Sequence, residues 1–158
     1  MSNPRTSRAA GDDLHPSEKV HSQMKLQYHH MNLCSDNVQR LSEFYRSVFD
    51  LGSASHQRIN VSNDGGYGGN VDLLTDGAVE FHLARKDVDL GFRMNHAINP
   101  LERGHFCFRT ADIEAFKRRL KEKNIPFSDY GTWAMAGWYQ IFFHDPDGNI
   151  IEVHQTGK

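Results

Sequence analysis

The chain has 158 residues, 38% hydrophobic and 24% charged, a composition typical of one soluble globular domain or of two small fused modules. Its 18 Lys and Arg residues and 20 Asp and Glu residues leave a net charge of −2, which argues against nucleic acids and anionic membranes as partners. The longest apolar run, Trp133 to Ala136, is too short for a transmembrane helix or signal peptide, so we expect a cytoplasmic protein.

The first half of the chain predicts a strand, a helix and three further strands. Residues 1–25 show no apolar periodicity, which predicts a flexible tail. A strand is expected from Leu26, followed by a helix that is capped by Ser35 or Asp36 and ends at Gly52. The apolar residues expected to face a sheet are Val38, Leu41, Phe44, Tyr45 and Val48. Three strands should follow, near residues 53–61, 70–74 and 79–83.

The second half repeats this order. A strand is expected over 104–109, and a helix capped by Thr110 or Asp112 should follow. The inward residues of this helix are Ile113, Phe116 and Leu120. The remaining strands are expected near residues 126–129, 138–144 and 149–154. We therefore predict a single domain, 26–158, built of the modules 26–84 and 104–155 and a polar linker, 85–103.

Histidine and glutamate residues recur at matching places in the two modules. His30 and His105 lie 75 residues apart, each shortly before a helix cap. Val79-Glu-Phe-His82 is repeated 72 residues later as Ile151-Glu-Val-His154. A lone strand histidine is usually structural, but this recurrence favours a shared role.

These residues predict a metal site in a cleft between the modules. Residues two apart in a strand share a face, so Glu80 lies on the same face as His82. His30, His105 and Glu152 can then converge with either Glu80 or His82. Imidazoles and carboxylates of this kind suit a divalent ion, namely Fe, Mn, Co, Ni or Zn.

Three motifs resemble the vicinal oxygen chelate superfamily, which includes glyoxalase I, methylmalonyl-CoA epimerase, fosfomycin-resistance proteins and extradiol dioxygenases. These motifs are His30-Met-Asn-Leu33, Gly104-His-Phe-Cys-Phe108 and Asp145-Pro-Asp-Gly148-Asn-Ile-Ile-Glu152. The resemblance covers about residues 26–155. It implies an α+β fold of two tandem βαβββ modules that form a curved mixed sheet around a cleft. It also implies a divalent metal bound by His30, His105 and Glu152, and a homodimer.

The resemblance leaves the ligand from the fourth strand open. Val79-Glu80-Phe81 matches the common family pattern, whereas Phe81-His82-Leu83 matches a glyoxalase-like branch that shares the stretch Ile98-Asn-Pro100. We favour His82 as this ligand and Glu80 as a base or as a hydrogen-bonding partner of a ligand. His29 should face away from His30, and His154 lies at a strand end, so both are weaker candidates.

The first functional interpretation is a glyoxalase I-like lyase or isomerase that acts on a small oxygenated metabolite. In it, a metal holds neighbouring substrate oxygens, and Glu152 or Glu80 moves a proton. The first alternative is an Fe(II) extradiol-type dioxygenase, which needs only two histidines and one carboxylate. The second alternative is a protein that binds a small molecule, such as an antibiotic, without catalysis, as the bleomycin-resistance proteins of this fold do.

Overall fold

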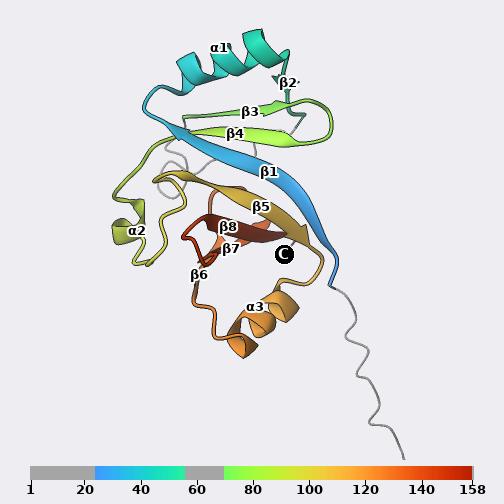
Figure 1. Ribbon diagram of the computed structural model, residues 1–158, viewed down its shortest axis with the longest axis vertical. Helices are drawn as coiled ribbons and strands as arrows, with labels where there is room; N and C mark the ends of the chain where they lie inside the picture. Colours follow the sequence, from blue (N-terminus) through green and yellow to red (C-terminus); the bar gives the residue numbers. More distant parts are fainter. Residues whose placement is uncertain (1–23, 56–69, 158) are drawn as a thin grey trace, which may run out of the picture.

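The computed structural model describes residues 24–55 and 70–157 (Figure 1). The predicted tail before Met24 and most of the strand expected at 53–61 lie outside these residues. The elements are β1 (Leu26–Ser35), α1 (Val38–Phe49), β2 (Gly52–Ser53), β3 (Val71–Thr75), β4 (Glu80–Arg85), α2 (Leu90–Arg93), β5 (Gly104–Thr110), α3 (Ile113–Glu122), β6 (Phe127–Thr132), β7 (Trp138–His144) and β8 (Ile150–Thr156). Among the described residues, no helix is long and apolar enough to cross a membrane.

The strands form one mixed sheet in the order β2-β3-β4-β1-β5-β8-β7-β6. Strands β1 and β5 are antiparallel neighbours at its centre, and each pairs in parallel with the last strand of its own half. Helices α1 and α3 lie at opposite ends of the sheet (Figure 1). The predicted α+β fold with two βαβββ modules in a curved sheet is therefore confirmed.

Both long helices begin at an acidic or amide side chain that caps the first turn. The Asn37 side chain accepts a hydrogen bond from the backbone N–H of Arg40, and Asp112 accepts one from Ala115. Asp112 was one of the two predicted caps of the second helix. The prediction of Ser35 or Asp36 for the first helix was wrong, because the Ser35 hydroxyl instead accepts from the Asn37 N–H and tightens the turn before it.

The buried face of α1 differs from the predicted stripe. Val38 is buried, but Phe44 and Val48 are 52% and 57% exposed. Ser42 is buried instead, and its hydroxyl donates to Asp72 Oδ2 at 2.6 Å. The helix therefore contacts the sheet through positions 38, 41, 42 and 45, and three of these, Val38, Leu41 and Tyr45, belong to the predicted stripe.

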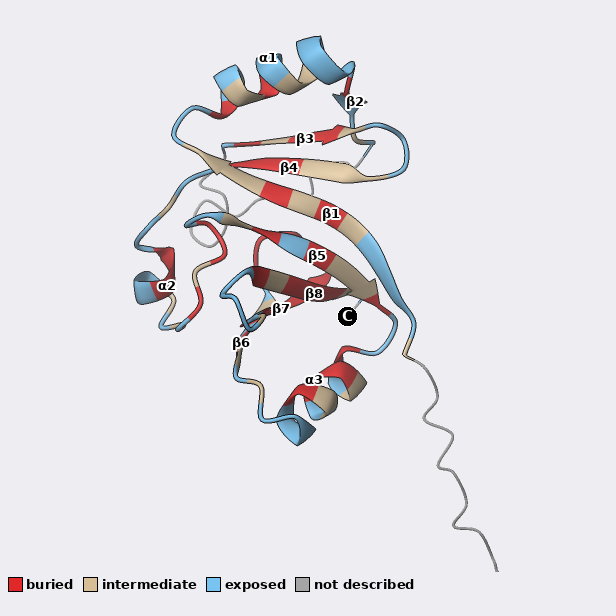
Figure 2. Cartoon of the chain, viewed as in Figure 1, coloured by how far each residue is buried: buried red, intermediate tan, exposed pale blue. Residues whose placement is uncertain are grey.

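The two faces of the sheet bury different cores. Leu74 and Leu83 pack under α1, and Ile141 and Val153 pack under α3, on the outer face. The neighbouring residues along these strands face inward, because side chains alternate between the two faces of a sheet. Along β1, buried and half-buried residues alternate in its middle part (Figure 2). The inner face carries a separate aromatic and aliphatic core, which includes Tyr130, Trp133, Trp138, Phe142 and Ile150.

The segment between the modules fills part of the inner face. Leu90, Ile98 and Leu101 are all at most 5% exposed and pack into the inner core. The sequence predicted a polar connection here, and it did not predict helix α2. Burial of these apolar side chains fixes the segment against the sheet, next to the end of β5 that carries His105.

Candidate metal centre

Two histidines and one glutamate bring ligand atoms together on the inner face of the sheet. His30 lies on β1, His105 on β5 and Glu152 on β8, and all three are at most 5% exposed. Glu152 Oε2 lies 3.6 Å from His30 Nε2 and 2.9 Å from His105 Nε2. None of these three buried atoms has a properly aligned hydrogen-bond partner among the described residues. Buried polar atoms are normally satisfied, so this convergence suits a bound cation.

Hydrogen bonds at the far sides of the ligands hold them in this orientation. His105 Nδ1 lies 3.1 Å from the Pro100 carbonyl oxygen and can only donate to it, which leaves the Nε2 lone pair facing Glu152. Gln140 Nε2 donates to Glu152 Oε1 at 3.0 Å, and this bond directs Oε2 toward the imidazoles. Metal-bound histidines and carboxylates usually have such supporting partners. The nitrogen and oxygen donors fit a divalent transition ion.

His82 on β4 lies beside this group and is fully buried. Its ring stacks on that of His30, with centroids 3.7 Å apart and planes 14° from parallel. His82 Nδ1 has no hydrogen-bond partner among the residues described, whereas Nε2 lies 2.9 Å from Glu80 Oε2. The structure thus brings His30, His105 and Glu152 together, places His82 beside His30, and places Glu80 next to His82.

When the two modules are compared through their strand pairing, His82, rather than Glu80, corresponds to Glu152. Helix caps Asn37 and Asp112 keep the offset of 75 that relates His30 to His105. On β1 and β4, Asn32 pairs with His82, and on β5 and β8, Cys107 pairs with Glu152. Because Asn32 and Cys107 also differ by 75, His82 occupies the position of Glu152. The sequence alignment of the two modules with an offset of 72 was therefore wrong by two residues at these strands. A shift of two residues keeps each side chain on the same face of its strand, so the sequence pattern does not reveal it.

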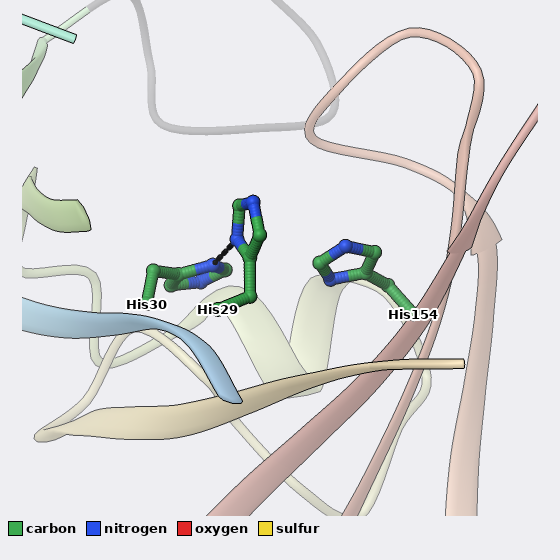
Figure 3. A group of neighbouring side chains, drawn as sticks. All are labelled: His29, His30 and His154. Carbon is green, nitrogen blue, oxygen red and sulfur yellow. Dashed lines mark hydrogen bonds between the residues drawn. The ribbon is translucent and has the colours of Figure 1, made fainter. Parts of the chain in front are cut away.

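His29 also joins the cluster, contrary to the sequence prediction. Pairing of β1 with β5 shifts register between Tyr28 and His30, so His29 is the extra residue of a β-bulge. His29 Nδ1 lies 2.9 Å from His30 Nδ1, and its ring centroid lies 4.9 Å from that of His154 (Figure 3). The bulge cancels the alternation that would have turned His29 away.

His154, Cys107 and Arg109 belong to the same cluster. His154 is fully buried, and its Nδ1 atom lies 3.3 Å from Glu152 Oε1 and 3.0 Å from Cys107 Sγ. Ligand atoms of Cys107, His30 and Glu152 lie within 4.8 Å of one another. The alternation of His105, Cys107 and Arg109 along β5 was the available signal for the latter two. His154 was undervalued because its strand continues to Thr156.

The electrostatics of the site favour neutral side chains at His29, His30 and His82 and an anionic Glu152. Burial lowers the pKa of His30 and His82 below the usual value and, with the nearby Arg109, lowers the pKa of His29 to about 3. Burial alone would raise the pKa of Glu152, but its contacts with three imidazoles hold it well below the usual range. These are the protonation states in which side chains bind a metal ion.

Acidification is expected to destabilise the metal-free protein below about pH 6.5, the usual pKa of histidine in an unfolded chain. The folded state keeps His29, His30 and His82 neutral, whereas the unfolded state binds their protons. Each such residue should lower the free energy of unfolding by up to about 1.4 kcal/mol per pH unit. The depressed pKa of Glu152 adds a loss only below about pH 4.5.

Urea unfolding followed by circular dichroism between pH 8 and pH 5 measures this dependence. In the matched variant His29→Gln, the free energy of unfolding should fall less steeply as the pH decreases, because about one fewer proton is bound on unfolding. An identical slope in the variant would contradict a neutral His29 in the folded protein.

A cavity reaches the edge of the cluster. Its volume is about 390 Å³, and its lining includes Tyr28, His29, Thr75, Glu80 and Arg109. His29 and Glu80 contact His30 and His82, respectively, so a molecule in this cavity lies one side chain from the candidate ligands. The volume is in the range of small-metabolite sites.

Solved structures with the same fold come from several bacteria. Methylmalonyl-CoA epimerase from Mycobacterium tuberculosis is 20% identical, with a TM-score of 0.59 over 84% of this chain and 89% of that chain. A hypothetical protein from Bacillus halodurans C-125 is 14% identical, with a TM-score of 0.61 over 84% and 96% of the two chains. A Streptomyces coelicolor methylmalonyl-CoA epimerase variant in complex with 2-nitronate-propionyl-CoA is 20% identical, with a TM-score of 0.57 over 84% and 96%.

Sequence comparison identifies the family. No curated protein matches the chain. The family model of the glyoxalase, bleomycin resistance protein and dioxygenase superfamily matches residues 27–153, which include His30, His82, His105 and Glu152. Because this match spans most of the sequence and agrees with the fold, the chain belongs to the glyoxalase/bleomycin resistance protein/dioxygenase superfamily.

Proposed function

We propose that this protein is a divalent-metal-dependent isomerase or lyase of the vicinal oxygen chelate type. The observation that carries the proposal is the convergence of His30 Nε2, His105 Nε2 and Glu152 Oε2, three buried atoms without hydrogen-bond partners among the described residues. They come from strands of both modules. In a binding protein that needs no metal, three buried polar atoms of this kind would lower the stability and serve no function.

We propose His82 as the fourth ligand. It occupies the place in the first module that Glu152 occupies in the second, and its buried Nδ1 atom has no hydrogen-bond partner within the described part of the chain. Glu80 then takes another role. It is half-buried, lines the cavity and contacts His82, so it is the carboxylate placed to meet a molecule that enters.

The proposed chemistry divides between the two carboxylates. A bound divalent ion would stabilise negative charge on two neighbouring oxygens of a substrate. Glu152 is fully buried and held by Gln140, which suits a ligand of fixed orientation. Glu80 would accept a proton from the substrate carbon and return it to the adjacent carbon. The substrate is proposed to be a small oxygenated metabolite in the cavity beside His29 and Glu80.

An Fe(II) dioxygenase is the second candidate function. The three unpartnered atoms come from two histidines and one carboxylate, the set that such enzymes use. Oxygen consumption with catechols separates this candidate from a lyase or isomerase. Methylglyoxal with glutathione and methylmalonyl-CoA are the corresponding substrates for the first proposal, the latter because the similar solved structures include methylmalonyl-CoA epimerases.

Metal analysis of protein purified without a polyhistidine tag tests the proposal directly. We expect about one ion per chain after incubation with Ni, Co, Zn, Mn or Fe(II), followed by removal of free metal. Less than about 0.1 ion per chain with each of these metals would contradict the proposal and favour a metal-free binding protein. Sedimentation of the same sample tests the homodimer that the family resemblance implies.

A further inference from the structure

Arg109 is a cation at the edge of the candidate metal centre, and the proposed reaction does not yet use it. It is half-buried on β5, four residues after His105. Its Nε atom donates to His154 Nε2 at 2.9 Å, and Nη2 lies 2.6 Å from His29 Nε2. Its guanidinium carbon lies 5.4 Å from the ring centroid of Trp138. These contacts hold the guanidinium between the cluster and the cavity.

The contacts of Arg109 do not neutralise its charge. Within the ranges 24–55 and 70–157, Arg109 forms no ion pair with a carboxylate, and its hydrogen-bond acceptors are two imidazoles. The nearby carboxylates, Glu80 and Glu152, pair with histidines. A partly desolvated guanidinium binds carboxylate and phosphate strongly because several N–H groups can donate to one oxyanion.

Arg109 also lines the cavity that His29 and Glu80 share. An oxyanion in this space would meet the guanidinium while the rest of the molecule reaches toward His30 and His82. Glu80 faces the same cavity and would repel an oxyanion placed next to it, which favours the Arg109 side for the charged group.

The positions of the imidazole protons indicate that metal binding at His30 would release Nη2 of Arg109 from its hydrogen bond with His29. Arginine only donates hydrogen bonds, so His29 Nε2 accepts from it, and His29 then carries its proton on Nδ1 and donates to His30 Nδ1. A neutral His30 that offers Nε2 to a metal must instead carry its own proton on Nδ1. His29 then accepts at Nδ1 and carries a proton on Nε2, so Nη2 of Arg109 loses this acceptor.

We propose that Arg109 binds an oxyanion group of the substrate, a carboxylate or a phosphate, while the metal centre holds two neighbouring oxygens of the same molecule. This inference rests on the proposed function and narrows its substrate to an anionic metabolite. Arg109 acts on the substrate through direct contact and takes no part in the transfer of the proton.

Binding calorimetry on the cobalt-loaded protein separates the two parts of this proposal. Glycolate offers only the chelating oxygens, malate adds a carboxylate, and 3-phosphoglycerate adds a phosphate. At least one of the two longer probes should bind about 10–100-fold more tightly than glycolate, as expected for a hydrogen-bonded ion pair. The probe with the larger gain identifies the kind of oxyanion.

The variant Arg109→Gln should lose this gain, measured as the affinity of each longer probe relative to that of glycolate for the same variant. Arg109→Lys should keep only part of it, because lysine lacks the planar fork. Arg103→Gln is the matched control, since the side chain of Arg103 is 84% exposed, and it should behave as the wild type does. Circular dichroism of each variant verifies that it is folded.

Equal affinity for all three probes, or a gain that survives in Arg109→Gln, would overturn the role of Arg109. Failure of the proposed function looks different, because then the protein takes up no cobalt. In that case succinate and inorganic phosphate are titrated into the metal-free protein. Binding that Arg109→Gln abolishes would support the oxyanion site, and binding that is absent or unchanged would overturn it.

Discussion

Glutamine in place of Glu152 is expected to weaken metal binding by more than about 100-fold, since even the loss of a partner behind a ligand costs about 10–100-fold. Glutamine has nearly the same shape but no negative charge. Glu152 supplies the anionic atom among the three unpartnered donors, and the imidazoles around it cannot replace that charge. Activity should fall with occupancy.

His105→Ala should weaken binding to a similar extent, because it removes a nitrogen that the Pro100 carbonyl holds in place. Competition with a chromogenic chelator measures both affinities. His144→Ala provides the control, since His144 is an exposed histidine at the end of β7. Metal affinity in Glu152→Gln within about threefold of the wild type would show that the three unpartnered atoms do not form the site.

The second large effect is expected to separate metal binding from catalysis on β4. His82→Ala should lower metal occupancy, because His82 stands where the second module has Glu152. Glu80→Gln should retain the metal and lower kcat by about 10²–10⁴-fold, the usual contribution of a general base. Glu80 reaches the cavity, whereas His82 is fully buried.

Metal content and kcat of both variants, measured on the same preparations, decide between these roles. His82→Ala should remain folded because a cavity at the edge of a polar cluster costs less than one in the apolar core, and thermal unfolding verifies this. The opposite pattern, in which Glu80→Gln loses the metal and His82→Ala retains it, would make Glu80 the ligand. It would also show that module symmetry does not extend to the ligand set.

The strands and helices were largely predictable because their signals are local. The strand expected near 138–144 is β7 with the same bounds, and the inward residues Ile113, Phe116 and Leu120 of α3 are buried as expected. Helix α1 was less well predicted, since Phe44 and Val48 extend the apolar stripe but remain exposed. An apolar residue at the margin of a helix face is buried only if the neighbouring strand reaches it.

The residues of the candidate site were predictable where the sequence signal lay within a single strand. His30 and His105 were found because they recur at matching places in the two modules, and Glu152 because the Glu-x-His pattern places it on one face of its strand. Their grouping on the inner face agrees with that prediction, and their role as ligands stays a prediction. The same alternation made His29 only a weaker candidate, and the bulge that reverses this result depends on pairing with β5.

The order of the strands and of the two long helices, the duplication and the residues that share a strand face could be predicted from the amino-acid sequence, because they follow from local periods and repeated motifs. Three features could be seen only in the folded chain: His82 corresponds to Glu152, His29 enters the cluster, and Arg109 contacts His154 beside a cavity. The physical reason is that register and bulges arise from hydrogen bonds between strands far apart in the chain. A shift of two residues in such pairing preserves every local pattern, so it can be resolved only when the strands are side by side.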